Sequence, residues 1–175
     1  MDAVPVPVPV GELRVNVWFH AADSGDINTL RTFIDNGVDL NTRAASGYTA
    51  LMWAARSGHQ DCVHLLIDAN AALDTQDNYD HTALSLAAQS GMVDCVRRLI
   101  DANANLEIQD SSRRTAFLQA AANGHIECAL MLMDAKADVT SCQPRAVTPL
   151  MVATLTGSAD VQRLLDGNAD VNLSG

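Results

Sequence analysis

Small and apolar residues occur in short stretches with helical spacing, and glycine ends several of these stretches. One stretch runs from Thr49 to Ser57 and stops at Gly58. The next, from His59 to Ile67, places its apolar side chains on one side of a helix. Threonine is a favourable N-cap and glycine a common helix terminator. The pattern therefore predicts two short helices joined by a tight turn.

The same pattern returns every 33 residues. Turn-rich segments such as residues 76–80 separate one helix pair from the next, as a hairpin-like connection requires. Because a single unit cannot bury its apolar face, neighbouring units must stack. The aligned columns are Thr49, Thr82, Thr115 and Thr148; Gly25, Gly58, Gly91, Gly124 and Gly157; and Cys62, Cys95 and Cys128, each 33 residues apart.

These landmarks resemble the ankyrin repeat. Thr148-Pro149-Leu150 matches the start of the family's T-P-L-H box, and Ala54-Ala55 and Gly58-His59 match further positions. The resemblance covers about residues 12–173 and implies an all-α solenoid of stacked helix-turn-helix units with hairpin-like loops. The expected repeats are about 12–43, 44–76, 77–109, 110–142 and 143–173, after a Val/Pro-rich tail at residues 1–11.

The chain departs from the family pattern in several places. The histidine of T-P-L-H is absent from every repeat, which predicts softer loops than in a consensus array. Lys136 stands where Asn70 and Asn103 stand in other repeats, at a position that favours glycine or asparagine because φ is positive there. No polar capping helix follows repeat 5, so we expect either a self-capping repeat or, preferably, a longer protein. Asn172 resembles a site of asparaginyl hydroxylation, but it also fits the ordinary hairpin consensus.

Composition and charge narrow the possible functions. Twenty-one acidic against eleven basic residues give a net charge of −10, which opposes binding to a nucleic-acid backbone. No apolar run approaches the ~20 residues that span a bilayer, so direct membrane insertion is not expected. Four cysteines without a secretory signal indicate reduced thiols and a cytoplasmic or nuclear location.

Two candidate chemistries fail on spacing. His59/Cys62 and His125/Cys128 could each face one metal ion, but the pairs lie two repeats apart, or ~20 Å at a helix-packing distance of ~10 Å. A column of aspartates at the second-helix ends is likewise too widely spaced for one calcium ion. We expect both columns to be structural. Without a nucleophile–base pair or a phosphate-binding loop, the sequence predicts no enzyme, no cofactor and no metal.

The family resemblance implies a protein-binding module or scaffold that uses its loop tips and concave face. Tyrosine, tryptophan and arginine dominate interface energetics, and such residues gather on this side. We also expect the ordered array to be monomeric. The candidate partner-binding residues are Arg43, Tyr48, Trp53, Arg56, Tyr79, His81, Gln89, Arg113, Arg114, Asn123 and Arg145.

Charge on this side differs from that of the whole chain. Five of the eleven basic residues are expected there, opposed by Asp23, Asp77, Asp80 and Asp110. Such segregation favours an acidic or phosphorylated peptide as partner, although loop-tip arginines also serve solubility alone. The alternatives are a structural spacer within a longer multidomain protein and, less favoured by charge, nucleic-acid binding.

Overall fold

The structure, a computed structural model, describes residues 12–138. The predicted tail and repeat 5 lie outside these residues, as do Arg145 and Asn172. The described part contains helices and loops and no strand. Its eight helices are α1 (Glu12–Ser24), α2 (Ile27–Asp35), α3 (Ala50–Ser57), α4 (Gln60–Asp68), α5 (Ala83–Ser90), α6 (Val93–Asp101), α7 (Ala116–Ala122) and α8 (Ile126–Asp134).

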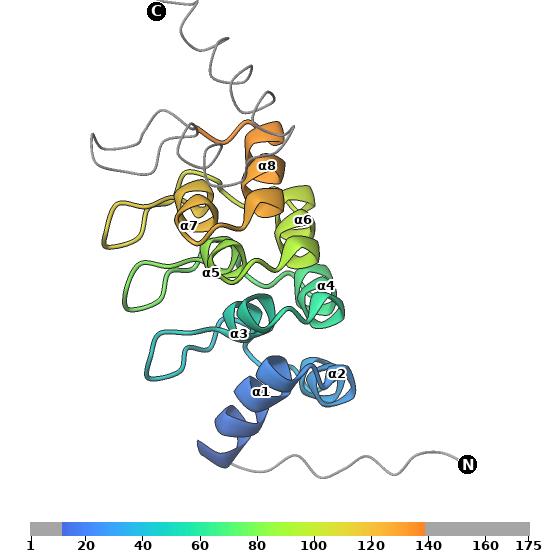
Figure 1. The fold of residues 1–175 in the computed structure, drawn as a ribbon. Coiled ribbons are helices and arrows are strands. Elements are labelled where there is room, and N and C mark those ends of the chain that lie inside the picture. The colour runs from blue at the N-terminus through green and yellow to red at the C-terminus, as the bar shows by residue number, and fades with distance from the viewer. Residues whose placement is uncertain (1–11, 139–175) are drawn as a thin grey trace, which may run out of the picture.

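The helices form two parallel rows (Figure 1). One row contains α1, α3, α5 and α7, each packed on the next, and the second row contains α2, α4, α6 and α8. Loops between successive pairs project to one side of the first row as long hairpins. This arrangement confirms the predicted all-α solenoid of stacked helix-turn-helix units.

The predicted threonine caps are present at α3, α5 and α7. The hydroxyl oxygens of Thr49, Thr82 and Thr115 accept hydrogen bonds from backbone amides three residues later, at 3.3, 3.2 and 3.5 Å. In two repeats the residue at the missing T-P-L-H histidine completes a capping box. Ser85 Oγ accepts the amide of Thr82 at 2.9 Å, and Met52 Sδ lies 3.4 Å from the amide of Thr49. The cap geometry therefore survives without the family's histidine.

Positive-φ residues occupy the turns that the sequence marks. Gly58 and Gly91 end α3 and α5 with φ of 80° and 72°. After the second helices, Asn70, Asn103 and Lys136 have φ of 66°, 63° and 71°. The prediction that Lys136 takes a left-handed conformation is confirmed, and this conformation is costly for a residue with a Cβ.

The core consists mainly of leucine and alanine, with an aromatic pair in repeat 1. Trp18 is buried against Phe33, with ring centroids 5.7 Å apart. The cysteine column lies inside the stack, as predicted, and its three described thiols are buried and free. Burial raises the pKa of Cys95 to about 12 and that of Cys128 to about 11.

One column of polar side chains ties each described repeat to the next at the base of the second helices. Side-chain oxygens of Asn41, Asp74 and Glu107 accept backbone amides from the following repeat. The three donors are Ala72, Asn105 and Asp138, at 2.9, 2.9 and 2.8 Å. Because donors and acceptors both recur at the repeat spacing, the bond forms at every described junction.

A second column of ties lies at the turns between paired helices. His59 Nε2 donates to the backbone carbonyl of Asp23 at 2.8 Å, and His125 Nε2 donates to that of Gln89 at 3.0 Å. Each ring packs over a glycine of the preceding repeat, Gly25 or Gly91, where an added Cβ would lie within 2.7 Å of the imidazole. These two histidines are therefore structural ties between repeats.

Candidate protein-binding surface

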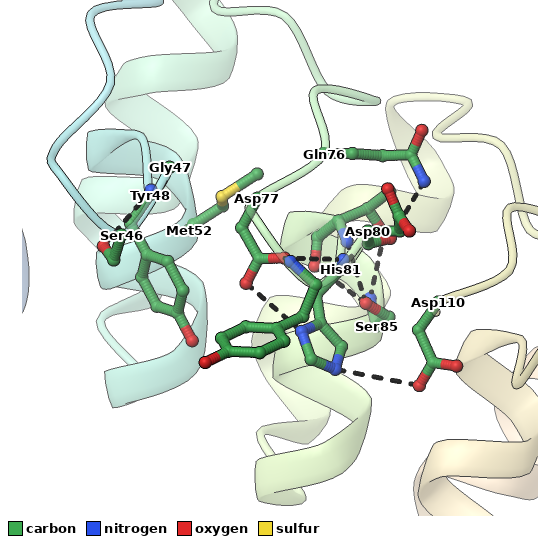
Figure 2. A network of polar contacts seen from close by, with 12 residues as sticks. Ser46, Gly47, Tyr48, Met52, Gln76, Asp77, Asp80, His81, Ser85 and Asp110 are labelled. Carbon is green, nitrogen blue, oxygen red and sulfur yellow. Dashed lines mark hydrogen bonds and ion pairs between the residues drawn. The ribbon is translucent and has the colours of Figure 1, made fainter. Parts of the chain in front are cut away.

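Buried aspartates organise the hairpins of repeats 3 and 4. In repeat 3, Asp77 Oδ1 accepts the backbone amides of Tyr79 and His81, both at 2.8 Å. The imidazole of His81 lies between two carboxylates (Figure 2): Nδ1 is 3.2 Å from Asp77 Oδ2, and Nε2 is 3.7 Å from Asp110 Oδ2. His81 thus links its own hairpin to the next one.

Asp110 plays the corresponding part in repeat 4. Its Oδ1 accepts the amides of Ser112 and Arg114 at 2.8 and 2.9 Å. Its Oδ2 accepts Arg114 Nε at 3.0 Å and Gln119 Nε2 at 2.6 Å. The side chains of Asp77 and Asp110 are at most 1% exposed, so both carboxylates stabilise loops and neither faces a partner.

Repeat 2 is built differently because Ala44 replaces the aspartate. Its hairpin keeps the two backbone bonds that also close the hairpins of repeats 3 and 4: the amide of Ala44 donates to the carbonyl of Tyr48, and the amide of Gly47 donates to that of Ala44, both at 2.8 Å. Arg43 Nε adds a bond to the carbonyl of Gly47 at 3.2 Å. With no carboxylate inside the loop, the side chain at position 48 is not held by its own hairpin.

The side chain of Tyr48 instead packs on the first helix of its repeat. Its ring centroid lies 4.8 Å from that of Trp53, with the planes tilted by 53°. The guanidinium carbon of Arg56 lies 5.9 Å from the Tyr48 ring centroid. Burial raises the pKa of the Tyr48 hydroxyl, and the carboxylate of Asp77 raises it further, while Arg56 opposes the shift. We call Tyr48, Trp53 and Arg56 the repeat-2 cluster.

Besides the half-buried Tyr48 and Trp53, the predicted partner-binding residues in the described part of the chain fall into two groups. Arg56, Tyr79 and Arg113 are exposed, and none of them forms an ion pair with another described residue. Tyr79 has 65% of its surface exposed. The second group makes hydrogen bonds within the array and has less freedom to meet a partner. This group comprises Arg43, His81, Gln89, Arg114 and Asn123.

Sequence reasoning missed the scaffold beneath these side chains. It counted Asp77 and Asp110 as charges opposing a basic surface, whereas both are buried loop organisers. It also passed over Gln119, which is fully buried and contacts Asp110. The 33-residue spacing between the two aspartates was an available signal. Their burial was not, because it depends on how successive hairpins stack.

The structure does not bring the candidate metal ligands together. His59 and His125 are tied to backbone carbonyls, and their neighbouring cysteines face the core. Within residues 12–138 no three His, Cys, Asp or Glu side chains converge as ligands for one ion. Likewise, none of the described helices combines the length and apolarity needed to cross a bilayer.

Two rows of paired helices with hairpins on one side define a helical-repeat protein that offers an extended surface. The sequence comparison is consistent with this class: a family model described as ankyrin repeats (three copies) matches residues 18–110 and 102–174. The chain therefore belongs to the ankyrin-repeat family. A search of curated proteins gives no match.

Proposed function

We propose that this chain is a non-catalytic protein-binding module or scaffold that uses its hairpins and the exposed side of α3, α5 and α7. Ankyrin repeats are generally protein–protein interaction modules, which supports the coarse assignment. The observation that supports this surface is the repeat-2 cluster together with the exposed Tyr79 on the adjacent hairpin. Aromatic and arginine side chains contribute most to interface energetics.

An acidic partner fits this surface best. Arg56 and Arg113 are exposed there without ion pairs to described residues, whereas two of the opposing aspartates are buried in the loops. The second-helix row carries Asp35, Asp68, Asp101 and Asp134, all exposed. We further propose that the array acts as a monomer in the cytoplasm or nucleus, where its cysteines stay reduced.

Two paired variants test the placement of the binding surface. Tyr48→Ala/Tyr79→Ala removes the aromatic anchors, and Asp68→Ala/Asp101→Ala changes the opposite row. Truncating an interface anchor costs about 2 kcal/mol or more, whereas surface changes elsewhere stay within about ±0.5 kcal/mol. The measurement is quantitative affinity capture from cell extract, with circular dichroism to show that each variant is folded.

The outcomes separate the competing functions. We expect partners of the wild type to be lost from the tyrosine variant and retained by the aspartate variant. Loss from the aspartate variant alone would place the interface on the second-helix row. If neither variant changes what is captured, the array acts as a spacer. Arg114→Ala is unsuitable as a binding variant because it also removes a contact to buried Asp110.

A further inference from the structure

Repeat 2 differs from repeats 3 and 4 at three columns that meet on the exposed side. Where repeats 3 and 4 have a buried aspartate, repeat 2 has Ala44. Where they have His81 and Arg114, each held by its aspartate, repeat 2 has Tyr48. The third column holds Trp53 in repeat 2 and the fully buried Leu86 and Gln119 in repeats 3 and 4.

These three differences have one physical consequence. In repeats 3 and 4 the polar side chains of the hairpin base bond to one another and are satisfied within the array. In repeat 2 an aromatic pair takes their place, partly exposed and held by ring contact, with no carboxylate supplied by its own hairpin. The neighbouring cation, Arg56, is exposed and has no ion-pair partner in residues 12–138.

We propose, building on the protein-binding function above, that the repeat-2 cluster is the anchor site for the partner. It binds an Asp or Glu side chain of an extended partner segment, with an apolar residue of the same segment next to that acid. The guanidinium of Arg56 receives the carboxylate in a charge-assisted, two-bond contact. The exposed parts of the Tyr48 and Trp53 rings receive the apolar side chain.

The surroundings favour a carboxylate over a phosphate. Arg56 is the only cation in the cluster, and two acids act on neighbouring residues. Asp77 acts electrostatically on Tyr48, and Asp23 accepts a hydrogen bond from Ser57, the residue after Arg56, at 2.7 Å. A singly charged carboxylate is balanced by one guanidinium, whereas a phosphate carries up to two charges and is best bound by several cations.

The cluster is also preorganised for binding. The guanidinium lies over the face of Tyr48, where the ring quadrupole attracts a cation. Trp53 packs against the same tyrosine ring, with the ring centroids 4.8 Å apart. A side chain that is already oriented loses less conformational entropy when a ligand arrives.

The test is selection of a phage-displayed library of random 12-residue peptides on the immobilised wild-type chain. Selected peptides are then synthesised and their Kd values measured for wild type and variants. We expect enriched peptides to carry Asp or Glu beside an apolar residue. Arg56→Gln should weaken these peptides at least tenfold, and Tyr48→Ala should do the same. Arg97→Gln, which removes an exposed arginine of α6 on the second-helix row, should change Kd less than twofold.

Further measurements distinguish failure of the anchor site from failure of the proposed binding function. Selected peptides that lack acids, or that bind Arg56→Gln as tightly as wild type, overturn the anchor. If those peptides still lose affinity with Tyr79→Ala, the proposed binding function stands and only the anchor site at the repeat-2 cluster is wrong. A library that yields no binder contradicts both the anchor site and the proposed binding function. Replacing the peptide's acid by phosphoserine should not tighten binding; tightening beyond tenfold overturns the carboxylate assignment. Unchanged thermal melting of Arg56→Gln excludes misfolding as the cause.

Discussion

Two neighbouring junctions of the array have the same repeat spacing but different ties. Between repeats 3 and 4, His125 donates to the carbonyl of Gln89 at 3.0 Å. Between repeats 2 and 3, Met92 occupies the histidine position and its Sδ packs over Gly58. A thioether has no hydrogen to donate. Accordingly, the equivalent carbonyl, that of Arg56, accepts no hydrogen bond from a described residue outside its helix.

The hairpin ends of the two junctions differ as well. Between repeats 2 and 3 they are joined by Asn78, whose amide donates to Ser46 O at 3.3 Å and whose Nδ2 donates to Ala45 O at 2.9 Å. Between repeats 3 and 4, the amide of Ser111 donates to Tyr79 O at 3.0 Å, and the contact between His81 and Asp110 is added. The clear difference is at the turns, where the junction that carries the proposed anchor lacks the histidine hydrogen bond of the next junction.

The largest expected effect comes from Asp110→Ala, which removes the buried acceptor of the repeat-4 hairpin. The substitution leaves buried Gln119 and the amides of Ser112 and Arg114 without their acceptor. Each unsatisfied buried group costs about 1–3 kcal/mol, so we expect a loss of about 3 kcal/mol in the free energy of unfolding. Urea denaturation measures it. The exposed Asp101→Ala is the control, and an equal loss in both variants would contradict the role given to Asp110.

A smaller effect is expected when the two junctions exchange their turn residues. His125→Met should cost about 1 kcal/mol, the usual worth of one hydrogen bond, and Met92→His should gain a similar amount. Each existing ring already packs over a glycine that leaves room for it. Hydrogen exchange of α5 and α6 together with urea denaturation measures both changes. If Met92→His leaves exchange unaltered, the missing tie does not distinguish the two junctions.

Lys136→Gly should stabilise the described end of repeat 4 by about 0.5–1 kcal/mol. Glycine avoids the steric cost at φ of 71° but loses more chain entropy on folding, which limits the gain. The matched control is Ala135→Gly, because Ala135 has φ of −77° and gains nothing from glycine. Thermal melting is the measurement, and equal shifts in the two variants would count against strain at Lys136.

The smallest effect on the free energy of unfolding appears only at alkaline pH. It comes from the buried thiols of Cys95 and Cys128, which lie on either side of the junction between repeats 3 and 4. Burial raises the pKa of Cys95 to about 12 and that of Cys128 to about 11, from an ordinary value near 9.0. A raised pKa means that the folded thiol keeps its proton longer. Its contribution to stability is therefore complete near neutral pH and declines as pH rises through the ordinary value near 9.0 toward the folded value.

We expect each of these thiols to lower stability by about half a kcal/mol between pH 8 and 9. Cys95→Ala and Cys128→Ala should each flatten that decline when urea midpoints are measured across this range. If neither substitution changes how steeply the urea midpoint falls with pH, these thiols do not cause the loss of stability at alkaline pH.

Much of the fold was predictable because it depends on local chemistry. Three threonines mark helix starts because each hydroxyl accepts the backbone amide three residues later: Thr49, Thr82 and Thr115. Gly58 and Gly91 mark helix ends because their φ is positive. Lys136 could be placed in a left-handed turn from its column alone. These features require only a few neighbouring residues, so the sequence pattern contains them.

The candidate site was only partly predictable because it depends on which hairpin side chains are buried. The columns put Tyr48, Trp53 and Arg56 on one side of the predicted stack, and the structure brings these three side chains together. The sequence did not separate them from His81 and Arg114, which have the same exposed-polar character but bond to buried aspartates. Whether such a side chain is used internally depends on whether its own hairpin has a buried aspartate four residues earlier.

The sequence by itself thus determined the helical repeat, its period, its caps and the inward column of cysteines. Each follows from spacing along one chain and from the preference of a residue for a backbone conformation or for the core. Only the tertiary structure decided that Asp77 and Asp110 are buried, that Met92 packs over Gly58, and that Tyr48 packs between its hairpin and the side chains of Trp53 and Arg56. These outcomes depend on how each hairpin folds back on its helix and on how successive repeats stack, and neither is fixed by local backbone preference.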